Sequence, residues 1–177
     1  FRILTFWVFR YGYLHHIGPI NMLSRSEQNP VLVKEFPEKF RQKFSQSQAR
    51  LVLQQLSMID ALANLRISTA QLYFEKLKGL KGIILPPMRE NQEHTYMSFP
   101  VQVKDREALI SSMMLAGRDV AGQHLRNCAD LAAFSDYKAD CPNARTAANS
   151  VVLLPTYPTY GHNEANKTAQ AVLDFFR

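Results

Sequence analysis

The side chains that most often bind metals or act as nucleophiles are sparse in this sequence. Its five histidines do not show the zinc-helix pattern of two His residues four apart, and none lies beside a pair of cysteines. We therefore predict no metal site. Cys128 follows His124 by four residues, but proximity in sequence does not make a catalytic pair, and a structural role is favoured. The histidines are His15, His16, His94, His124 and His162.

The acidic side chains show no paired arrangement either. Asp130, Asp136 and Asp140 lie in a stretch without helical or strand period, so their spacing does not direct two carboxylates at one substrate. We expect them to be solvated turn residues. The chain also lacks a glycine-rich phosphate loop and a G-x-S-x-G nucleophile motif. Residue chemistry alone therefore predicts a fold without an active site.

The composition is that of a globular protein, with 177 residues, 46% of them hydrophobic and 20% charged. The 21 Lys and Arg exceed the 15 Asp and Glu, giving a net charge of +6, but the cations are scattered singly without interleaved aromatic residues. We therefore predict no nucleic-acid partner. The two cysteines are too few for a secreted disulfide framework and indicate reduced thiols in the cytoplasm.

The longest element that the sequence predicts is a helix over residues 45–79. Its apolar residues recur every three or four positions, as on one face of a helix. Ser45 and Gln48 have the spacing of a capping box, and Gly79 provides a stop. Such a helix would span about 50 Å, so we interpret it as a spine that joins two bodies. Leu56 and Ile67 are predicted to be buried against the sheet.

Short strands and helices are predicted around this spine. Pro100 lacks the N–H that a strand ladder needs, so its strand is predicted to lie at an edge or to contain a bulge. The pattern predicts an α+β fold with a long spine helix and a small, mostly antiparallel sheet with helices on one face. The strands are expected at 82–85, 95–103, 118–123 and 150–154, and the helices at 105–116, 142–149 and 164–176.

Residues 1–40 are interpreted as an N-terminal arm and loop, separate from residues 41–177. The opening residues 1–23 are aromatic and apolar, but their longest uncharged run is too short to span a membrane. Two alternatives stay open for this segment: a buried or interface helix, or a helix lying on a membrane surface. The second alternative is supported by Arg2, Arg10, His15 and His16.

Several segments together carry the pattern of one protein family. FSQSQARLVLQQL at residues 44–56 is similar to the signature R-M-S-x-x-Q-A-A-L-G-L-x-Q-L, and residues 96–103 are similar to the strand Y-x-R-Y-P-V-x-V. Residues 141–144 and 153–158 match the closing pattern. The chain therefore resembles the DegT/DnrJ/StrS family of sugar aminotransferases, which depend on pyridoxal phosphate (PLP). The signature matches are Ser45, Gln48, Ala49, Leu51, Leu53, Gln55 and Leu56.

The resemblance implies the C-terminal small domain of a fold-type-I aminotransferase, without its large domain. In the family, the Schiff-base lysine and the aspartate that holds the pyridine nitrogen lie upstream of the spine helix. Lys34, Lys39 and Lys43 do not have that lysine's sequence setting, so the chain alone is expected to be inactive. The parent enzyme would be a homodimer that transfers an amino group from an amino-acid donor to a nucleotide-linked keto sugar, for polysaccharide or cell-surface sugar biosynthesis.

The resemblance also singles out Arg41 and Lys43 as cofactor-binding residues. They match an Asn-x-Arg pair whose Asn reaches the cofactor phosphate of the neighbouring subunit. Both are cations that could hold a phosphate, and a solvated basic approach to the helix is the alternative. Ser98 also departs from the pattern, which has Arg there. Two functions stay open: part of a cytoplasmic enzyme, or a non-catalytic homologue that serves as a dimerisation or membrane-surface interaction module.

Overall fold

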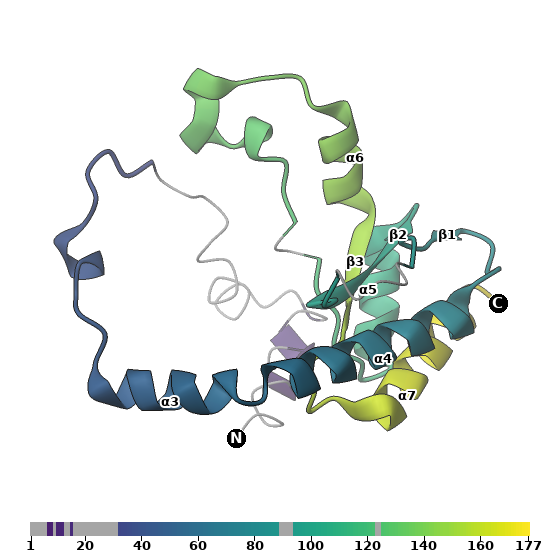
Figure 1. Cartoon of the computed structure of the whole chain (residues 1–177). Coiled ribbons are helices and arrows are strands. Elements are labelled where there is room, and N and C mark those ends of the chain that lie inside the picture. Colours follow the sequence, from purple (N-terminus) through teal and green to yellow (C-terminus); the bar gives the residue numbers. More distant parts are fainter. Residues whose placement is uncertain (1–6, 9, 13–14, 16–31, 89–93, 123–124) are drawn as a thin grey trace.

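The computed structural model describes residues 7–8, 10–12, 15, 32–88, 94–122 and 125–177 (Figure 1). These ranges form an α+β fold, as predicted. The strands are β1 (Ile83–Ile84), β2 (Ser98–Val103) and β3 (Val151–Pro155). The helices are α3 (Gln46–Leu56), α4 (Ile59–Leu77), α5 (Arg106–Leu115), α6 (Pro142–Ser150) and α7 (Gly161–Phe175). Short 3-10 helices are η1 (Glu38–Phe40), η2 (Cys128–Asp130) and η3 (Ala132–Tyr137).

The sheet has three strands in the order β1-β2-β3, and both pairings are antiparallel. Pro100 lies in the central strand β2, opposite Leu153 of β3, so its predicted place at an edge is wrong. The reason is that β1 is short: it ends at Ile84, opposite Gln102, and does not reach Pro100. On that side β2 is locally unpaired, and the missing N–H of Pro100 therefore breaks no bond to β1.

The strand predicted at residues 118–123 is wrong, because a single antiparallel bridge between Ala121 and Leu153 takes its place. The Ala121 amide donates to the Leu153 carbonyl at 3.1 Å, and the Leu153 amide donates back at 2.7 Å. Gly122 then lies against α5 so closely that a Cβ would be 2.9 Å from Ile110 Cδ1. The bridge is limited to one residue pair, and Leu125 donates to the Gly122 carbonyl at 3.2 Å.

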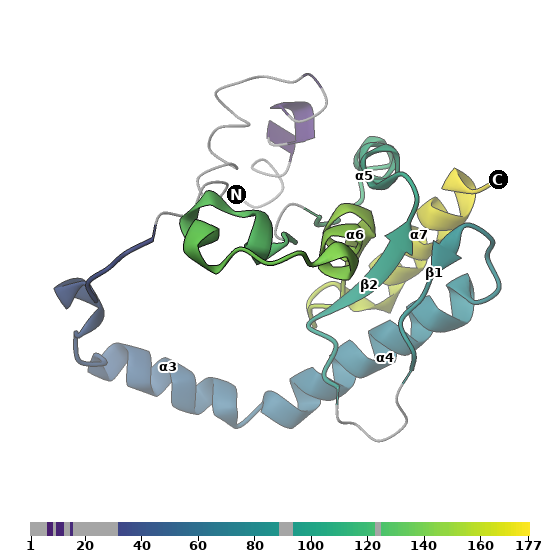
Figure 2. The same ribbon diagram turned by 90° about the horizontal axis from the view of Figure 1, so that it is seen from above.

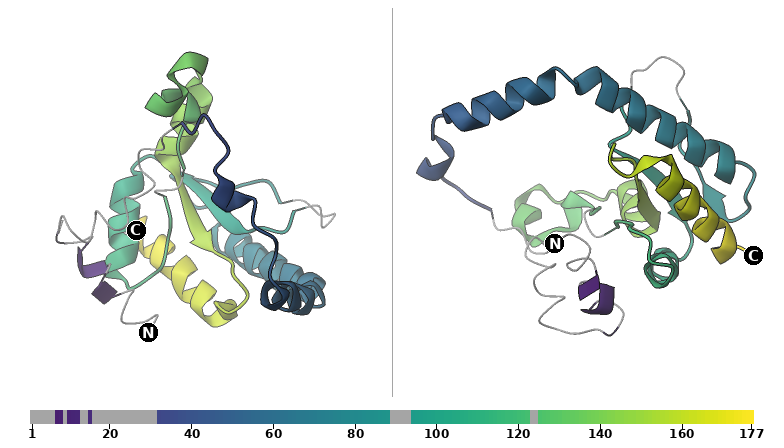
Figure 3. Two further views of the ribbon diagram at one scale, coloured as in Figure 1. Left: turned by 90° about the vertical axis from the view of Figure 1, so that its left-hand side faces the viewer. Right: turned by 90° about the horizontal axis from the view of Figure 1, so that it is seen from below.

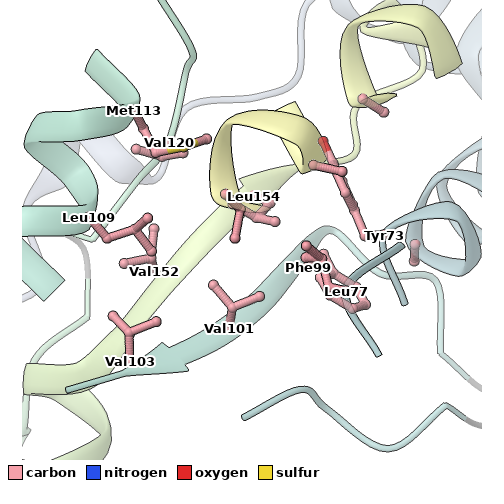
Figure 4. Close-up of a cluster of buried hydrophobic side chains, with 14 of the residues drawn as sticks. Tyr73, Leu77, Phe99, Val101, Val103, Leu109, Met113, Val120, Val152 and Leu154 are labelled. Carbon is pink, nitrogen blue, oxygen red and sulfur yellow. The ribbon is translucent and has the colours of Figure 1, made fainter. Parts of the chain in front are cut away.

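Helices α4, α5 and α7 cover one face of the sheet, as predicted (Figure 1). Alternate residues of β2, such as Phe99 and Val101, point into this layer and are buried. Figure 4 shows them converging with Tyr73 of α4, Leu109 of α5 and Leu154 of β3. Each such side chain contributes about 1.5–3 kcal/mol when fully buried, so this layer is the main source of stability.

The predicted spine of residues 45–79 is two helices rather than one. Ser57 and Met58 separate α3 from α4, and Met58 has φ −109° and ψ 1°, outside the helical region. No residue of α3 is buried. Leu56 is 53% exposed, so its predicted burial is wrong, whereas Ile67 of α4 does pack against the core. The helical period identified the apolar residues but did not show which of them have packing partners.

Residues 32–56 extend away from the sheet and its covering helices. These residues, rather than the predicted N-terminal arm of residues 1–40, are called the arm below. Figures 2 and 3 show α3 continuing beyond the end of the domain that α4, α7 and the sheet form. Burial along the spine begins only in α4, where Thr69, Ala70, Tyr73 and Leu77 are enclosed. The described chain therefore consists of a packed domain and an arm without packing partners of its own.

Candidate functional site

Arg41 lies at the end of η1, in the approach to α3. Its Nη1 donates to Glu38 Oε1 at 2.8 Å, and its guanidinium carbon lies 5.8 Å from the centre of the Phe36 ring. The side chains are 60% exposed for Arg41 and 81% for Glu38. An exposed ion pair of this kind is worth at most about 1 kcal/mol. A phosphate could therefore replace Glu38 on Arg41 at little cost in stability.

Lys43 is exposed in the extended chain just before Ser45, where α3 begins. The predicted capping box is confirmed: the Gln48 amide donates to Ser45 Oγ at 3.2 Å, and the Ser45 amide donates to Gln48 Oε1 at 2.9 Å. The positive end of the α3 dipole thus lies next to two cations, an arrangement that suits an anion. Neither Arg41 nor Lys43 is enclosed by the described part of the chain.

The lysines do not fit covalent binding of a cofactor. A lysine that forms a Schiff base needs a lowered pKa, which proteins obtain by removing the amine from water or placing it beside another cation. All the lysine side chains whose burial the structure describes are exposed, so desolvation is not available to them. They are Lys34, Lys43, Lys76, Lys78, Lys81, Lys104, Lys138 and Lys167. In the described part of the chain, the candidate cofactor contact is therefore with a phosphate group, at Arg41 and Lys43.

Cys128 is exposed in η2, and its suggested pairing with His124 lies outside the described residues. His162 of α7 has its Nε2 2.9 Å from Ser68 Oγ of α4. Ser68 Oγ also lies 3.0 Å from the Leu65 carbonyl, so its hydroxyl has a second possible acceptor within its own helix. This exposed pair links α4 to α7. In the described ranges, no group of three or more His, Cys, Asp or Glu could hold a metal ion.

Asp130 and Asp140 are exposed, in keeping with the expectation that they are solvated, and Arg145 binds both of them. Arg145 binds both oxygens of Asp130, at 2.8 and 2.9 Å, and one oxygen of Asp140 at 3.3 Å. Asn127 adds a hydrogen bond to Asp130 at 2.9 Å. The bonds from Arg145, and then that from Asn127, lower the pKa of Asp130 to about 2. This cluster is a clip between η2 and α6 rather than an acid-base pair.

A buried threonine that the sequence reasoning missed fixes the start of β2. The fully buried Thr156 has its hydroxyl 2.6 Å from the Tyr96 carbonyl and 2.9 Å from the Met97 carbonyl. Tyr96 has φ 47°, which is uncommon for a residue with a side chain. The Tyr96 amide donates to His94 Nδ1 at 2.9 Å. A polar residue after the closing Leu-Leu-Pro was the only available signal.

Tyrosine hydroxyl groups join α4 to β3 and hold the start of α7 against its own middle turns. Tyr73 donates to the Pro155 carbonyl at 3.0 Å, and Tyr160 shares a hydrogen bond with Thr168 at 2.6 Å. Burial raises the pKa of both tyrosines, so their hydroxyls stay protonated at neutral pH. Beside them, Arg118 binds Glu164 at 2.7 Å. The groups satisfy one another, which indicates a structural role.

The N-terminal segment contacts the end of α5 through Arg10. Its Nε donates to the Met114 carbonyl at 2.5 Å and its Nη2 to the Leu115 carbonyl at 2.9 Å, while Trp7 covers the guanidinium at 4.3 Å. Arg10 thus caps carbonyls that a helix end leaves unpaired. Of the other cations cited for membrane contact, Arg2 and His16 lie outside the described residues. Within the described ranges, no helix combines the length and apolarity needed to cross a membrane.

The profile of the DegT/DnrJ/EryC1/StrS aminotransferase family matches residues 25–173. No curated protein gives a significant match to the chain. The structure is similar to DesV of S. venezuelae in complex with a ketimine intermediate, with a TM-score of 0.69 and 24% identity, over 77% of this chain and 41% of DesV. The chain therefore spans about two fifths of the length of that relative.

Two further structures share the fold. A DegT/DnrJ/EryC1/StrS aminotransferase from Brucella abortus has a TM-score of 0.67 and 17% identity, over 73% of this chain and 35% of that one. The E. coli GDP-4-keto-6-deoxy-D-mannose-3-dehydratase with bound hydrated PLP has a TM-score of 0.57 and 14% identity, over 67% and 33%. The expected likeness to part of an aminotransferase fold is confirmed.

Proposed function

Because the chain belongs to the DegT/DnrJ/EryC1/StrS aminotransferase family, we propose that it is the spine and small domain of a PLP-dependent sugar aminotransferase. The substrate would be a nucleotide-linked keto sugar, and the amino donor an amino acid. The E. coli enzyme with the same fold supports this substrate class, because its name describes a GDP-linked keto sugar. The enzyme would work in the cytoplasm, in polysaccharide or cell-surface sugar biosynthesis.

The observation that carries this proposal is the exposed apolar surface of α3. Val52, Leu53 and Leu56 share one side of the helix, Leu51 lies on the other, and all four are exposed. A helix that is apolar on opposite sides belongs inside a larger body. The body proposed here is the large domain of the same polypeptide, since the chain spans 41% of the length of DesV.

The chain alone would then be inactive. PLP supplies an electron sink, but only when a lysine attaches it and an acidic group holds its ring nitrogen. The described lysine side chains are exposed, which does not suit that attachment. The large domain would supply both groups, and the small domain would supply the surface that closes over them. The proposal includes a division of the chain into an N-terminal arm at residues 1–40 and the spine helix with the small domain at residues 41–177.

Arg41 and Lys43 would contribute the phosphate contact. They lie at the α3 N-terminus, where backbone amides and the helix dipole favour an anion. Arg41 could present two N–H groups to phosphate oxygens, and Lys43 a compact positive charge. In the proposed homodimer, the phosphate would be that of the cofactor in the neighbouring subunit. The nucleotide sugar and the amino-acid donor would bind in the same interdomain site.

Two departures of this sequence from the family pattern favour a second candidate function. Arg41 stands where the family signature has Asn, and Ser98 where it has Arg. A homologue that has lost these contacts could keep the fold as a non-catalytic module for dimerisation or for docking on a membrane surface through residues 1–23. The two functions differ in whether PLP is retained.

The test is to treat the protein with PLP, reduce it with borohydride and map the modified lysines by mass spectrometry. The chain alone should show no single preferred lysine. A polypeptide that also carries the large domain should be modified at one lysine of that domain. In this longer polypeptide, Arg41→Ala with Lys43→Ala should weaken PLP retention in dialysis by about 10- to 100-fold for each charged hydrogen bond that is lost.

The matched control is Lys76→Ala with Lys81→Ala, which removes two exposed cations from the small domain. Its PLP retention should equal that of the unmodified protein. Stoichiometric modification of one lysine in the chain alone would contradict the proposed inactivity. Equal retention in both double variants would show that Arg41 and Lys43 are ordinary solvated cations. Absence of PLP from the longer polypeptide would favour the non-catalytic module.

A further inference from the structure

The break between α3 and α4 contains neither proline nor glycine. Ser57 has φ −64° and ψ −16°, and Met58 has φ −109° and ψ 1°. Sharp bends in helices usually have an identifiable cause, such as a side chain that competes for a backbone carbonyl. Here Ser57 Oγ donates to the Gln54 carbonyl at 2.8 Å. A serine hydroxyl bound in this way offers the backbone an alternative to the helical ladder.

The backbone hydrogen bonds change type at this break. The Met58 amide donates to Gln55, three residues back, at 3.1 Å, which is the 3-10 pattern. The Leu62 amide then donates to Met58, four residues back, at 2.9 Å, and the α-helical pattern resumes. A 3-10 turn inside a long helix often marks a functional hinge, because its hydrogen-bond geometry is poorer than that of the α-helix.

The angle between α3 and α4 is not fixed by packing, because neither the break nor α3 is enclosed by described residues. Every residue from Ser57 to Ala61 is exposed, and α3 contains no buried residue. The far part of α4 is anchored instead, because Tyr73 and Leu77 are fully buried against the sheet and α7. One side of the break therefore has a rigid base and the other has none.

We propose that Ser57 and Met58 form a hinge that lets α3 change its angle to the small domain. The 11 residues of α3 span about 16 Å, so a rotation of about 20° would move its far end by about 6 Å. The hinge would adjust the small domain relative to the body that holds α3. This inference deepens the proposed function. Only the identity of the body that holds α3 rests on that proposed function.

Spin labels can measure the hinge in the chain alone, without cofactor or substrate. The labels are attached at Arg50→Cys in α3 and Ala144→Cys in α6, both exposed, with Cys128 and Cys141 replaced by Ser. Pulsed electron-electron double resonance then gives the distribution of distances between the label in α3 and the label in α6. Ser57→Ala with Met58→Ala should narrow this distribution about twofold, because alanine favours a continuous helix. Met58→Gly should broaden it.

Asn64→Ala is the matched control, because it raises helix propensity at an exposed position of α4 away from the break. It should leave the distribution unchanged. Labels at Ser47 and Gln54, both within α3, should give the same narrow distribution in every variant, which separates bending from unwinding of α3. A narrow arm-to-domain distribution in the parent chain would overturn the hinge. An unchanged width in the double alanine variant, or a broad distribution within α3, would do the same.

Discussion

Helices α3 and α4 are consecutive in the chain and continue the same apolar period, but only α4 has a buried face. Leu77 of α4 is fully buried, whereas Leu53 of α3 is 67% exposed. Both leucines belong to the stripe that predicted one long helix. The difference teaches that helical period reports which residues need burial, while their partners are set by tertiary structure. An apolar helix without partners indicates that part of its environment is another body.

The largest effect should come from shortening one leucine in each helix. Leu77→Ala should lower the free energy of unfolding by about 2–5 kcal/mol, because it leaves a cavity in the core. Leu53→Ala should change it by less than about 0.5 kcal/mol, because this side chain is exposed. Urea unfolding measures both. Comparable losses at the two sites would show that α3 is packed in solution, and the contrast between the helices would fail.

A smaller effect on stability should come from removing the N-cap of a packed helix, α5, and of the exposed helix α3. Asp105 accepts from the Ala108 amide at 3.0 Å at the start of the packed helix α5, and Ser45 plays the same part for α3. Asp105→Ala should cost about 0.5–2 kcal/mol of unfolding free energy. Ser45→Ala should reduce the helix content of α3 by circular dichroism without moving the urea midpoint. A shifted midpoint in Ser45→Ala would mean that α3 unfolds together with the domain.

The smallest effect concerns the clip between η2 and α6, which is exposed like the arm but has defined partners. The pKa of Asp130 is lowered from 3.8 to about 2, chiefly by Arg145. A lowered folded-state pKa gives stabilisation that is present above the unfolded value and is lost as the pH falls through the folded value. The clip should therefore open between about pH 4 and pH 2. Carbon NMR of the Asp130 carboxyl should follow this titration.

Arg145→Ala is the variant that checks the cause. Without the guanidinium, Asp130 should titrate closer to its ordinary value, since the remaining bond from Asn127 is the lesser cause of the shift. An unchanged titration of Asp130 in Arg145→Ala would show that the ion pair does not form in solution.

Local signals in the sequence predicted much of the fold. The capping box at Ser45, the helix after Asp105 and the antiparallel strands around Phe99 and Leu154 rest on short-range patterns, and the structure has each of them. The break at Ser57 was missed because no proline or glycine marks it. Its cause is a serine hydroxyl, and serine is common in continuous helices as well.

The long-range contacts could not be predicted, because no local pattern encodes them. Arg10 reaches α5 across more than a hundred residues, and Thr156 holds the carbonyls of Tyr96 and Met97 from a distant loop. For the candidate site, the resemblance selected Arg41 and Lys43, and their position beside the α3 N-terminus followed from the capping signal. Their exposure did not follow, since it depends on which body lies against the arm.

Hydrogen exchange followed by mass spectrometry tests the central claim most directly, namely that α4 has packing partners within the described part of this chain and α3 does not. In the chain alone, amides of α4 from Thr69 to Leu77 should be protected, because they unfold only with the core. Amides of α3 should exchange much faster than those of α4, because α3 can open without the core, and they should become protected in a polypeptide that carries the large domain. Equal protection of α3 and α4 in the chain alone would contradict the account.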